Sequence, residues 1–160
     1  MGTQLVMYDE EYQKINAVCD RLTKDANAKV VFLVDKNGQL IASAGQTQNI
    51  DTTSLASLTA GNVAAMGGLA KLIGENEFPN QFHEGTRDSL YMTIVASRVV
   101  LVVIFDARTS LGLVRLRVKK AADELAKIFE VLLKKSEASA GGGSPFAEIS
   151  DEDIDNLFSE

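Results

Sequence analysis

The sequence predicts a single α/β domain with a central five-stranded antiparallel sheet and helices on both faces, followed by a flexible C-terminal tail. Three observations predict this architecture. Apolar residues recur at helical spacing in three long segments, and short β-branched runs bounded by turn residues lie between those segments. The composition, 46% hydrophobic and 24% charged, suits a packed core. With 160 residues, the chain is long enough for one compact domain and leaves little room for a second.

A first helix is expected over residues 8–24, where apolar side chains repeat every three or four positions among charged ones. A β-hairpin follows. Val30–Val34 is a β-branched run, and Leu40–Ala44 is the returning strand. Asn37-Gly38 between them favours the positive φ angles that tight hairpin turns require.

Residues 51–76 predict a long helix of unusual composition. Asp51 is a suitable N-cap, and no proline interrupts the segment before Pro79. Small residues dominate the helix, and each glycine in its interior costs about 0.8–1 kcal/mol relative to alanine. Close approach of another backbone is the usual reason for such glycines. That backbone belongs either to the chain's own sheet or to a partner protein, and we favour the partner.

Three antiparallel strands are expected next, at about residues 80–83, 89–96 and 99–105, joined by turns of two to five residues. The last of them is almost continuously apolar, as are central strands that are covered on both faces. A final helix is expected over about residues 109–135, with an apolar stripe along its whole length.

These elements divide the chain into a domain over residues 1–136, a flexible linker over 137–145 and a tail over 146–160. The tail contains six acids and no lysine or arginine, so the remainder of the chain has 16 acids and 16 bases. A helical tail would gather a set of apolar residues into a docking motif, namely Ile149, Ile154, Leu157 and Phe158. The alternative is a disordered tail that only increases solubility.

Catalysis finds little support in the sequence. His83 is the only histidine and Cys19 the only cysteine, so neither a zinc site of the usual spacing nor a catalytic triad is predicted. The glycines do not match a phosphate-binding loop. We therefore expect no catalytic residue, no metal and no cofactor. The neutral body argues against nucleic acid as a partner, no segment suits a membrane span, and we expect a cytoplasmic protein.

One face of the small-residue helix is the candidate binding site. Its positions repeat at helical spacing and would form a flat, narrow surface; they are Ser57, Gly61, Ala64, Gly68, Lys71 and Leu72. The strand at residues 80–82 is short and polar and is expected at an edge of the sheet. Pairing of this edge across a two-fold axis would give a homodimer, although such an edge could equally be left in water.

The order helix, hairpin, small-residue helix, three-strand meander and helix resembles the roadblock (dynein light chain) family. The resemblance rests on the hairpin Val30–Val34 with Asp35-Lys36-Asn37-Gly38 and on the Gly/Ala-rich helix of residues 52–76, and it covers about residues 5–135. It implies a homodimer with one sheet continuous across both chains, whose paired long helices form a platform for a small Ras-like GTPase, the GTP-loaded form being preferred. It also implies activation of GTP hydrolysis in bacterial cell polarity and gliding motility, with the protein concentrated at a cell pole. Groups of the GTPase would be repositioned, and no catalytic residue supplied.

Three further hypotheses stay open from the sequence. An arginine supplied in trans would accelerate GTP hydrolysis by roughly 10³–10⁵; Arg87, Arg98 and Arg108 lie at predicted turns or strand ends that could carry one. A dimeric adaptor that tethers partner proteins without changing GTP turnover would use the same helix. Finally, the acidic tail would dock on the GTPase at a second site.

Overall fold

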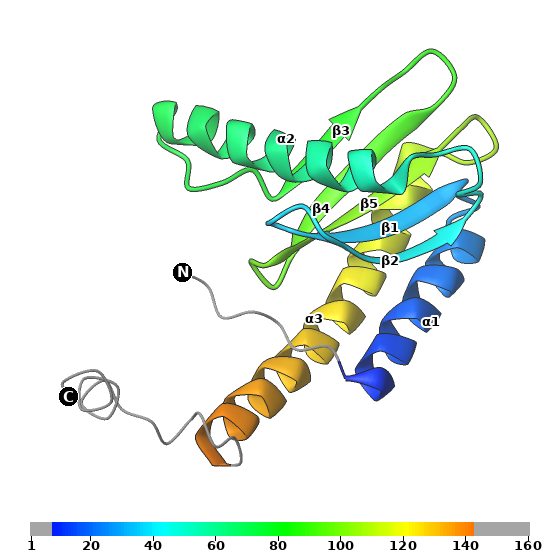
Figure 1. Ribbon diagram of the computed structural model, residues 1–160. Coiled ribbons are helices and arrows are strands. Elements are labelled where there is room, and N and C mark those ends of the chain that lie inside the picture. The colour runs from blue at the N-terminus through cyan, green and yellow to red at the C-terminus, as the bar shows by residue number, and fades with distance from the viewer. Residues whose placement is uncertain (1–7, 143–160) are drawn as a thin grey trace.

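The computed structural model describes residues 8–142 and consists of a five-stranded antiparallel sheet with helices on both faces (Figure 1). The elements follow one another as α1 (Asp9–Asp25), β1 (Val30–Asp35), β2 (Leu40–Gly45), α2 (Thr52–Leu72), β3 (Asn80–His83), β4 (Ser89–Val95), β5 (Val99–Phe105) and α3 (Leu111–Gly142). The strand order is β2-β1-β5-β4-β3. The predicted fold class is confirmed, with β3 at one edge of the sheet.

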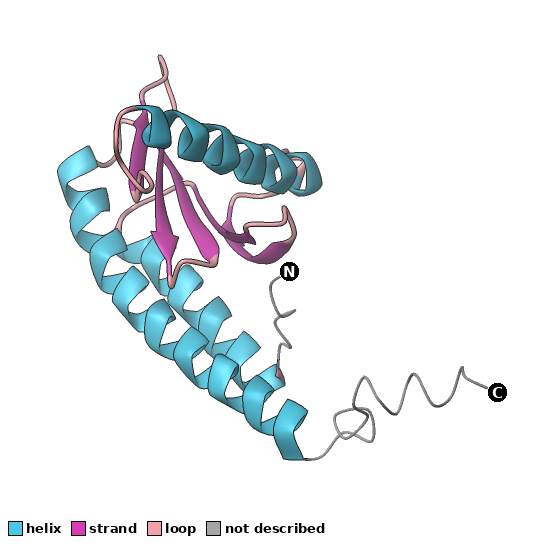
Figure 2. Cartoon of the chain, turned by 90° about the vertical axis from the view of Figure 1, so that its left-hand side faces the viewer, coloured by secondary structure: helices cyan, strands magenta, loops and turns pink. Residues whose placement is uncertain are grey.

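Helices α1 and α3 cover one face of the sheet, and α2 lies on the other (Figure 2). The central strand β5 shows why its sequence is continuously apolar: Leu101 and Val103 are buried toward α1 and α3, whereas Val100 and Val102 are buried on the α2 side. Alternate side chains of a strand point to opposite faces, so a strand covered on both sides needs apolar residues at every position.

Strands β1 and β2 each extend one residue beyond the predicted ends, to Asp35 and Gly45, and the turn between them covers residues 36–39. Only Gly38, with φ of +94°, has a positive φ angle in this turn, and the strand register shifts between Leu33 and Val34. The Asp35 carboxylate accepts hydrogen bonds from the backbone N–H groups of Asn37 and Gln39, each at 2.9 Å. These bonds hold a wider loop in place, because an Asp side chain can satisfy the N–H groups that a tighter turn would pair.

Helix α3 extends further than predicted. It begins after Ser110, whose Oγ accepts a hydrogen bond from the Leu113 N–H at 3.3 Å, and it continues to Gly142. The helix thus covers residues 137–142, where the sequence predicts the start of a flexible linker, because a helix that is already formed and packed can propagate through alanine-containing sequence. Residues 143–145 and the tail at 146–160 lie outside the described residues.

The C-terminal half of α3 is joined to the start of α1 by an ion pair. Glu11 is buried, and its Oε1 accepts a hydrogen bond from Lys135 Nζ. The same ammonium lies 3.7 Å from Glu10 Oε2 and 5.6 Å from the centre of the Tyr8 ring. The hydrogen bond from Lys135 holds the pKa of Glu11 below its ordinary value, and it raises the pKa of Lys135. The pair thus fixes the relative position of the two helices.

This pair predicts a loss of stability in acid. Because the pKa of Glu11 is lower in the folded protein than its ordinary value of 4.5, its stabilising contribution is complete above pH 4.5 and is lost as the pH falls through the folded value. Urea denaturation at a series of pH values should show a shallower acid dependence for Glu11→Gln than for the wild type. Glu10→Gln removes an exposed acid from the same helix turn and should leave the dependence almost unchanged. Equal slopes for the wild type and Glu11→Gln would contradict the assignment.

Candidate functional site

Helix α2 is fixed at both ends by local hydrogen bonds. At its start, the Asp51 carboxylate accepts from the Ser54 N–H at 3.1 Å and from the Ser54 hydroxyl at 2.6 Å, which lowers the pKa of Asp51. At its end, Gly74 takes a φ of +84°, and the Glu75 N–H donates to the Ala70 carbonyl at 2.9 Å. A glycine with positive φ commonly terminates a helix in this way. The helix therefore stops at Leu72, earlier than the predicted residue 76.

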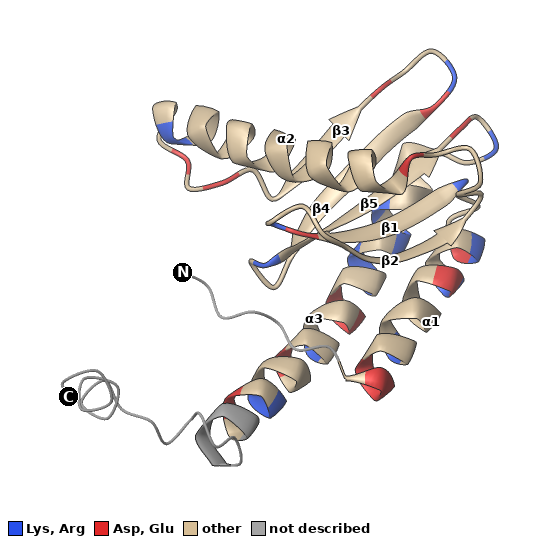
Figure 3. Ribbon diagram, in the orientation of Figure 1, with Lys and Arg blue, Asp and Glu red and all other residues tan. Residues whose placement is uncertain are grey.

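Only a narrow strip of α2 is buried. The buried residues of this helix are Ala56, Thr59 and Ala70. The turn residue Gly38 packs against the helix backbone, its missing Cβ position lying 3.4 Å from the Ser57 Cα. Apart from Lys71 near its end, α2 carries no charged residue (Figure 3). An uncharged helix that is mostly exposed is unusual for a protein surface and indicates a partner.

All six residues expected to bind a partner are exposed or half-buried on α2. Three of them, Ala64, Gly68 and Lys71, line a groove of about 390 Å³. The far wall of the groove comes from outside the helix and contains Lys36 and Glu77, whose side chains form an ion pair at 2.9 Å. The expected face thus exists as an accessible surface, and it borders a groove lined by uncharged residues of α2 and by three charged side chains, Lys36, Lys71 and Glu77.

The predicted residue Leu72 belongs to a group of exposed apolar side chains whose other members the sequence did not single out. Leu58 is 73% exposed and Leu72 is 84% exposed, and Leu69 and Ile73 are exposed as well. Leu58, Leu69 and Leu72 follow one another at helical spacing beside the glycine face. Their spacing was visible in the sequence, but a stripe of leucines normally faces the chain's own core, so it gave no signal of exposure.

The glycines of α2 have no packing reason within the described chain. A Cβ built on Gly61, Gly67 or Gly68 would meet no heavy atom within 4 Å. By contrast, a Cβ on Gly45 would lie 2.3 Å from the Lys29 carbonyl oxygen. Of the two explanations for the helical glycines, close approach to the chain's own sheet is therefore wrong for these three positions. They weaken an exposed helix without any compensating contact among residues 8–142.

The β3 edge has the predicted polar character. Its side chains are exposed or half-buried, and Asn80 Oδ1 accepts a hydrogen bond from Thr93 Oγ1 of β4 at 2.8 Å. Phe82 is an exception, since it is 40% exposed while its ring stacks on Phe105 at a centroid distance of 6.2 Å. One side of β3 pairs with β4, and its other side is an open sheet edge.

Residues suited to catalysis are scattered. His83 is exposed on β3, with its Nε2 3.3 Å from Gln81 Oε1, and Cys19 is buried, which raises the pKa of its thiol to about 12. Within residues 8–142, no group of three or more His, Cys, Asp or Glu residues could hold a metal ion. In the same range, no helix has the length and apolar character needed to cross a bilayer.

The three candidate arginines differ in their surroundings. Arg108 is held by Asp106, its Nε donating to the carboxylate at 3.0 Å. Arg98 is half-buried in the β4–β5 turn, where its carbonyl accepts from the Lys36 N–H at 3.1 Å. Arg87 is exposed in the loop between β3 and β4. The expected tail motif of Ile149, Ile154, Leu157 and Phe158 lies outside the described residues.

A five-stranded sheet with this helix arrangement defines a known class of regulatory domain. The family model described as Roadblock/LC7 domain matches residues 14–105, and the chain belongs to this family. The resemblance predicted from the sequence is confirmed.

Among solved structures, the chain is similar to Myxococcus xanthus MglB, with 91% identity over 80% of this chain and 96% of that chain and a TM-score of 0.76. It is also similar to the gliding protein MglB from Thermus thermophilus, with 33% identity, 81% and 98% coverage and a TM-score of 0.75. A third structure, described as MglB with tetrameric arrangement, is 33% identical, with 82% and 99% coverage and a TM-score of 0.76.

Proposed function

We propose that this protein activates GTP hydrolysis by a small Ras-like GTPase in bacterial cell polarity and gliding motility. It acts as a homodimer, prefers the GTP-loaded partner, supplies no catalytic residue and repositions groups of the GTPase. The close match to MglB supports a roadblock-type regulator. We place it in the cytoplasm, concentrated at a cell pole. The observation that carries the proposal is the exposed, glycine-containing face of α2, which has no packing role within the described chain.

The geometry of α2 suits contact with a folded partner. Ser57, Gly61, Ala64 and Gly68 present little side-chain volume, so the partner backbone can come close to the helix. The groove beside them gives an anchoring side chain a place to insert, and Lys71 in its lining can receive a carboxylate. Leu72 extends the contact with apolar area, the component that dominates the energy of protein interfaces.

Dimerisation through β3 follows from its open edge. An edge strand has unpaired N–H and C=O groups, and a second copy in antiparallel orientation would pair them in a two-fold arrangement. Phe82 would add apolar area to that contact, since it is 40% exposed in the single chain. The tetrameric arrangement described for a 33% identical MglB supports self-association in this family.

The arrangement of the arginines favours repositioning over an arginine supplied in trans. The Arg108 side chain is engaged by Asp106, and Arg98 is half-buried, so reaching a GTPase active site would require either to rearrange. Arg87 is the exposed member of the three and is the one to replace first. The acidic tail engages the GTPase at a second site, through its apolar residues Ile149, Ile154, Leu157 and Phe158.

The test is single-turnover GTP hydrolysis by the cognate GTPase, with and without an excess of this protein. We expect acceleration by the wild type, equal acceleration by Arg87→Ala, and tighter binding to the GTP-loaded than to the GDP-loaded GTPase. A loss of roughly 10³-fold or more for Arg87→Ala with binding preserved would establish an arginine supplied in trans. Binding without acceleration, and without nucleotide preference, would instead establish the adaptor.

A further inference from the structure

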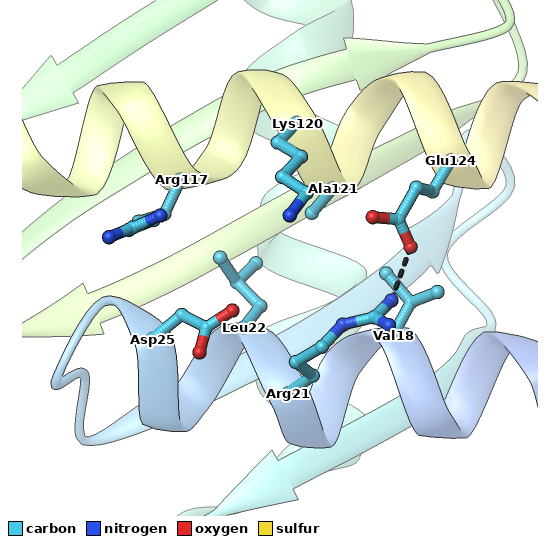
Figure 4. Close-up of a pocket in the computed structure, with 8 residues that line it drawn as sticks. All are labelled: Val18, Arg21, Leu22, Asp25, Arg117, Lys120, Ala121 and Glu124. Carbon is cyan, nitrogen blue, oxygen red and sulfur yellow. Dashed lines mark hydrogen bonds and ion pairs between the residues drawn. The ribbon is translucent and has the colours of Figure 1, made fainter.

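A second groove lies on the opposite side of the molecule from α2, between α1 and α3. It has a volume of about 340 Å³, and Lys14, Arg21 and Lys127 stand along it. A smaller hollow continues toward Arg117 and Lys120 (Figure 4). We call the surface formed by these five residues, Lys14, Arg21, Arg117, Lys120 and Lys127, the basic groove.

The basic groove has an excess of positive charge, because its five cations are accompanied by two acids in the lining, Asp25 and Glu124. Arg21 is paired with Glu124, and Lys14 is paired with Glu10 at 3.4 Å. Arg117, Lys120 and Lys127 form no ion pair with another residue in the range 8–142. The Arg117 Nε atom is in addition shielded from solvent without a hydrogen-bond partner in this range. A buried guanidinium N–H without an acceptor destabilises the protein, so a carboxylate that reached this atom would be stabilising.

The groove also has an apolar component. Ala17, Val18 and Ile128 contribute to its lining between the cations. Val131, about one helical turn further along α3, is 44% exposed. A surface of this kind fits an acidic segment that carries spaced apolar side chains, because both kinds of group find complements in it.

The chain itself contains such a segment. Residues 146–160 hold six acids, no lysine or arginine, and apolar residues that include Ile154 and Leu157. Lys127 lies 15 residues before the end of α3 at Gly142, a distance of about 22 Å along a helix. Residues 143–150 can span up to about 26–29 Å when extended, so the acids from Asp151 onward can return to the groove.

We propose that residues 146–160 dock in the basic groove of the same chain. A single surface ion pair is weak. Because the tail is tethered to the domain, its effective concentration at the groove is of millimolar order, so several weak ion pairs together hold the tail reversibly. Where the tail has a second site on a GTPase, which rests on the proposed function, it must leave the basic groove to reach it. The affinity of the groove for the tail then determines what fraction of the tail is free to bind the GTPase.

Paramagnetic relaxation in the full-length protein, without any GTPase, tests this docking. A nitroxide on Ser159→Cys labels the tail outside its apolar motif, and buried Cys19 stays unlabelled because its thiol remains protonated. The ¹⁵N-labelled, tagged chain is diluted into a large excess of unlabelled, untagged chain, which isolates contacts within one chain. We expect broadening of amides near Lys14, Arg21 and Lys127, none on α2, and recovery in high salt.

Charge reversal supplies the matched control. Lys120→Glu with Lys127→Glu should abolish the broadening, whereas Lys119→Glu with Lys134→Glu, at positions of α3 outside the groove, should preserve it. Absence of broadening at the groove would overturn the proposal. Broadening seen only when the tag and the ¹⁵N label are on different chains would overturn docking within one chain and assign the groove to the tail of a second copy. Neither result depends on whether a GTPase is activated.

Discussion

Gly68→Arg should abolish the acceleration of GTP hydrolysis while leaving the protein folded and dimeric. Gly68 lines the 390 Å³ groove on α2, and a Cβ built there meets no atom within 4 Å. The helix backbone therefore has room for a side chain at this position, and replacing the glycine should raise the stability of the helix by a few tenths of a kcal/mol or more. A partner that approaches the helix backbone has no space for it. We expect a loss of about 100-fold in activation at limiting protein concentration, the size of a central interface defect.

Gly112→Arg is the matched control for this experiment. Gly112 is an exposed helical glycine with no atom within 4 Å of a built Cβ, but it lies on α3 on the other side of the sheet. The two variants make the same chemical change, so only Gly68→Arg should reduce activation in the single-turnover assay. Circular dichroism and sedimentation should show the same fold and oligomeric state for both. Equal activity of the two variants would remove the glycine face of α2 from the binding site.

Much of the fold could be predicted from local sequence patterns. The β3 and β5 boundaries were predicted correctly, because β-branched or polar runs end at clear turn residues there. Boundaries that depend on a single backbone angle were less accurate. Gly74 belongs by composition to the small-residue helix, yet its φ of +84° ends that helix, and composition alone does not reveal the angle. The α3 end was missed for a related reason, since glycine and serine weaken a helix without forbidding it.

The candidate site was predictable in position but not in environment. Helical spacing placed Ser57, Gly61, Ala64 and Gly68 on one face, and that face is accessible. Spacing could not identify the side that packs on the sheet, because small residues surround α2 almost completely. It also could not bring in Lys36, which reaches the groove from the β1–β2 hairpin, or Glu77, which follows the end of α2 and folds back beside it. The basic groove has the same origin, since its cations come from two helices about 100 residues apart.

These two surfaces lie on opposite faces of the sheet and differ in chemistry. The α2 face is almost uncharged and suits close packing, whereas the α1–α3 face is charged and suits weak, reversible contacts. A GTPase bound on α2 would therefore leave the basic groove accessible. This separation allows the basic groove and α2 to be altered independently, so the glycine variants and the lysine variants test the two proposals separately.

Phe129→Ala should destabilise the protein more than any surface change discussed above. Phe129 is fully buried in the cluster that joins α1, α3 and the sheet, where it is among the largest side chains without solvent exposure. Its truncation leaves a cavity that the packed helices cannot close, and such losses cost about 3–5 kcal/mol. Urea denaturation at fixed protein concentration measures the change, because dimerisation would otherwise contribute to the apparent stability.

The neighbouring exposed position provides the comparison. Val131 lies two residues further along α3 and is 44% exposed, so Val131→Ala should change the free energy of unfolding by no more than about 1 kcal/mol. At temperatures where Phe129→Ala remains folded, it should still accelerate GTP hydrolysis, because α2 packs on the opposite face of the sheet. Equal destabilisation by the two substitutions would mean that this part of α3 does not pack against α1. Loss of activation in folded Phe129→Ala would mean that the α3 face communicates with α2 through the sheet.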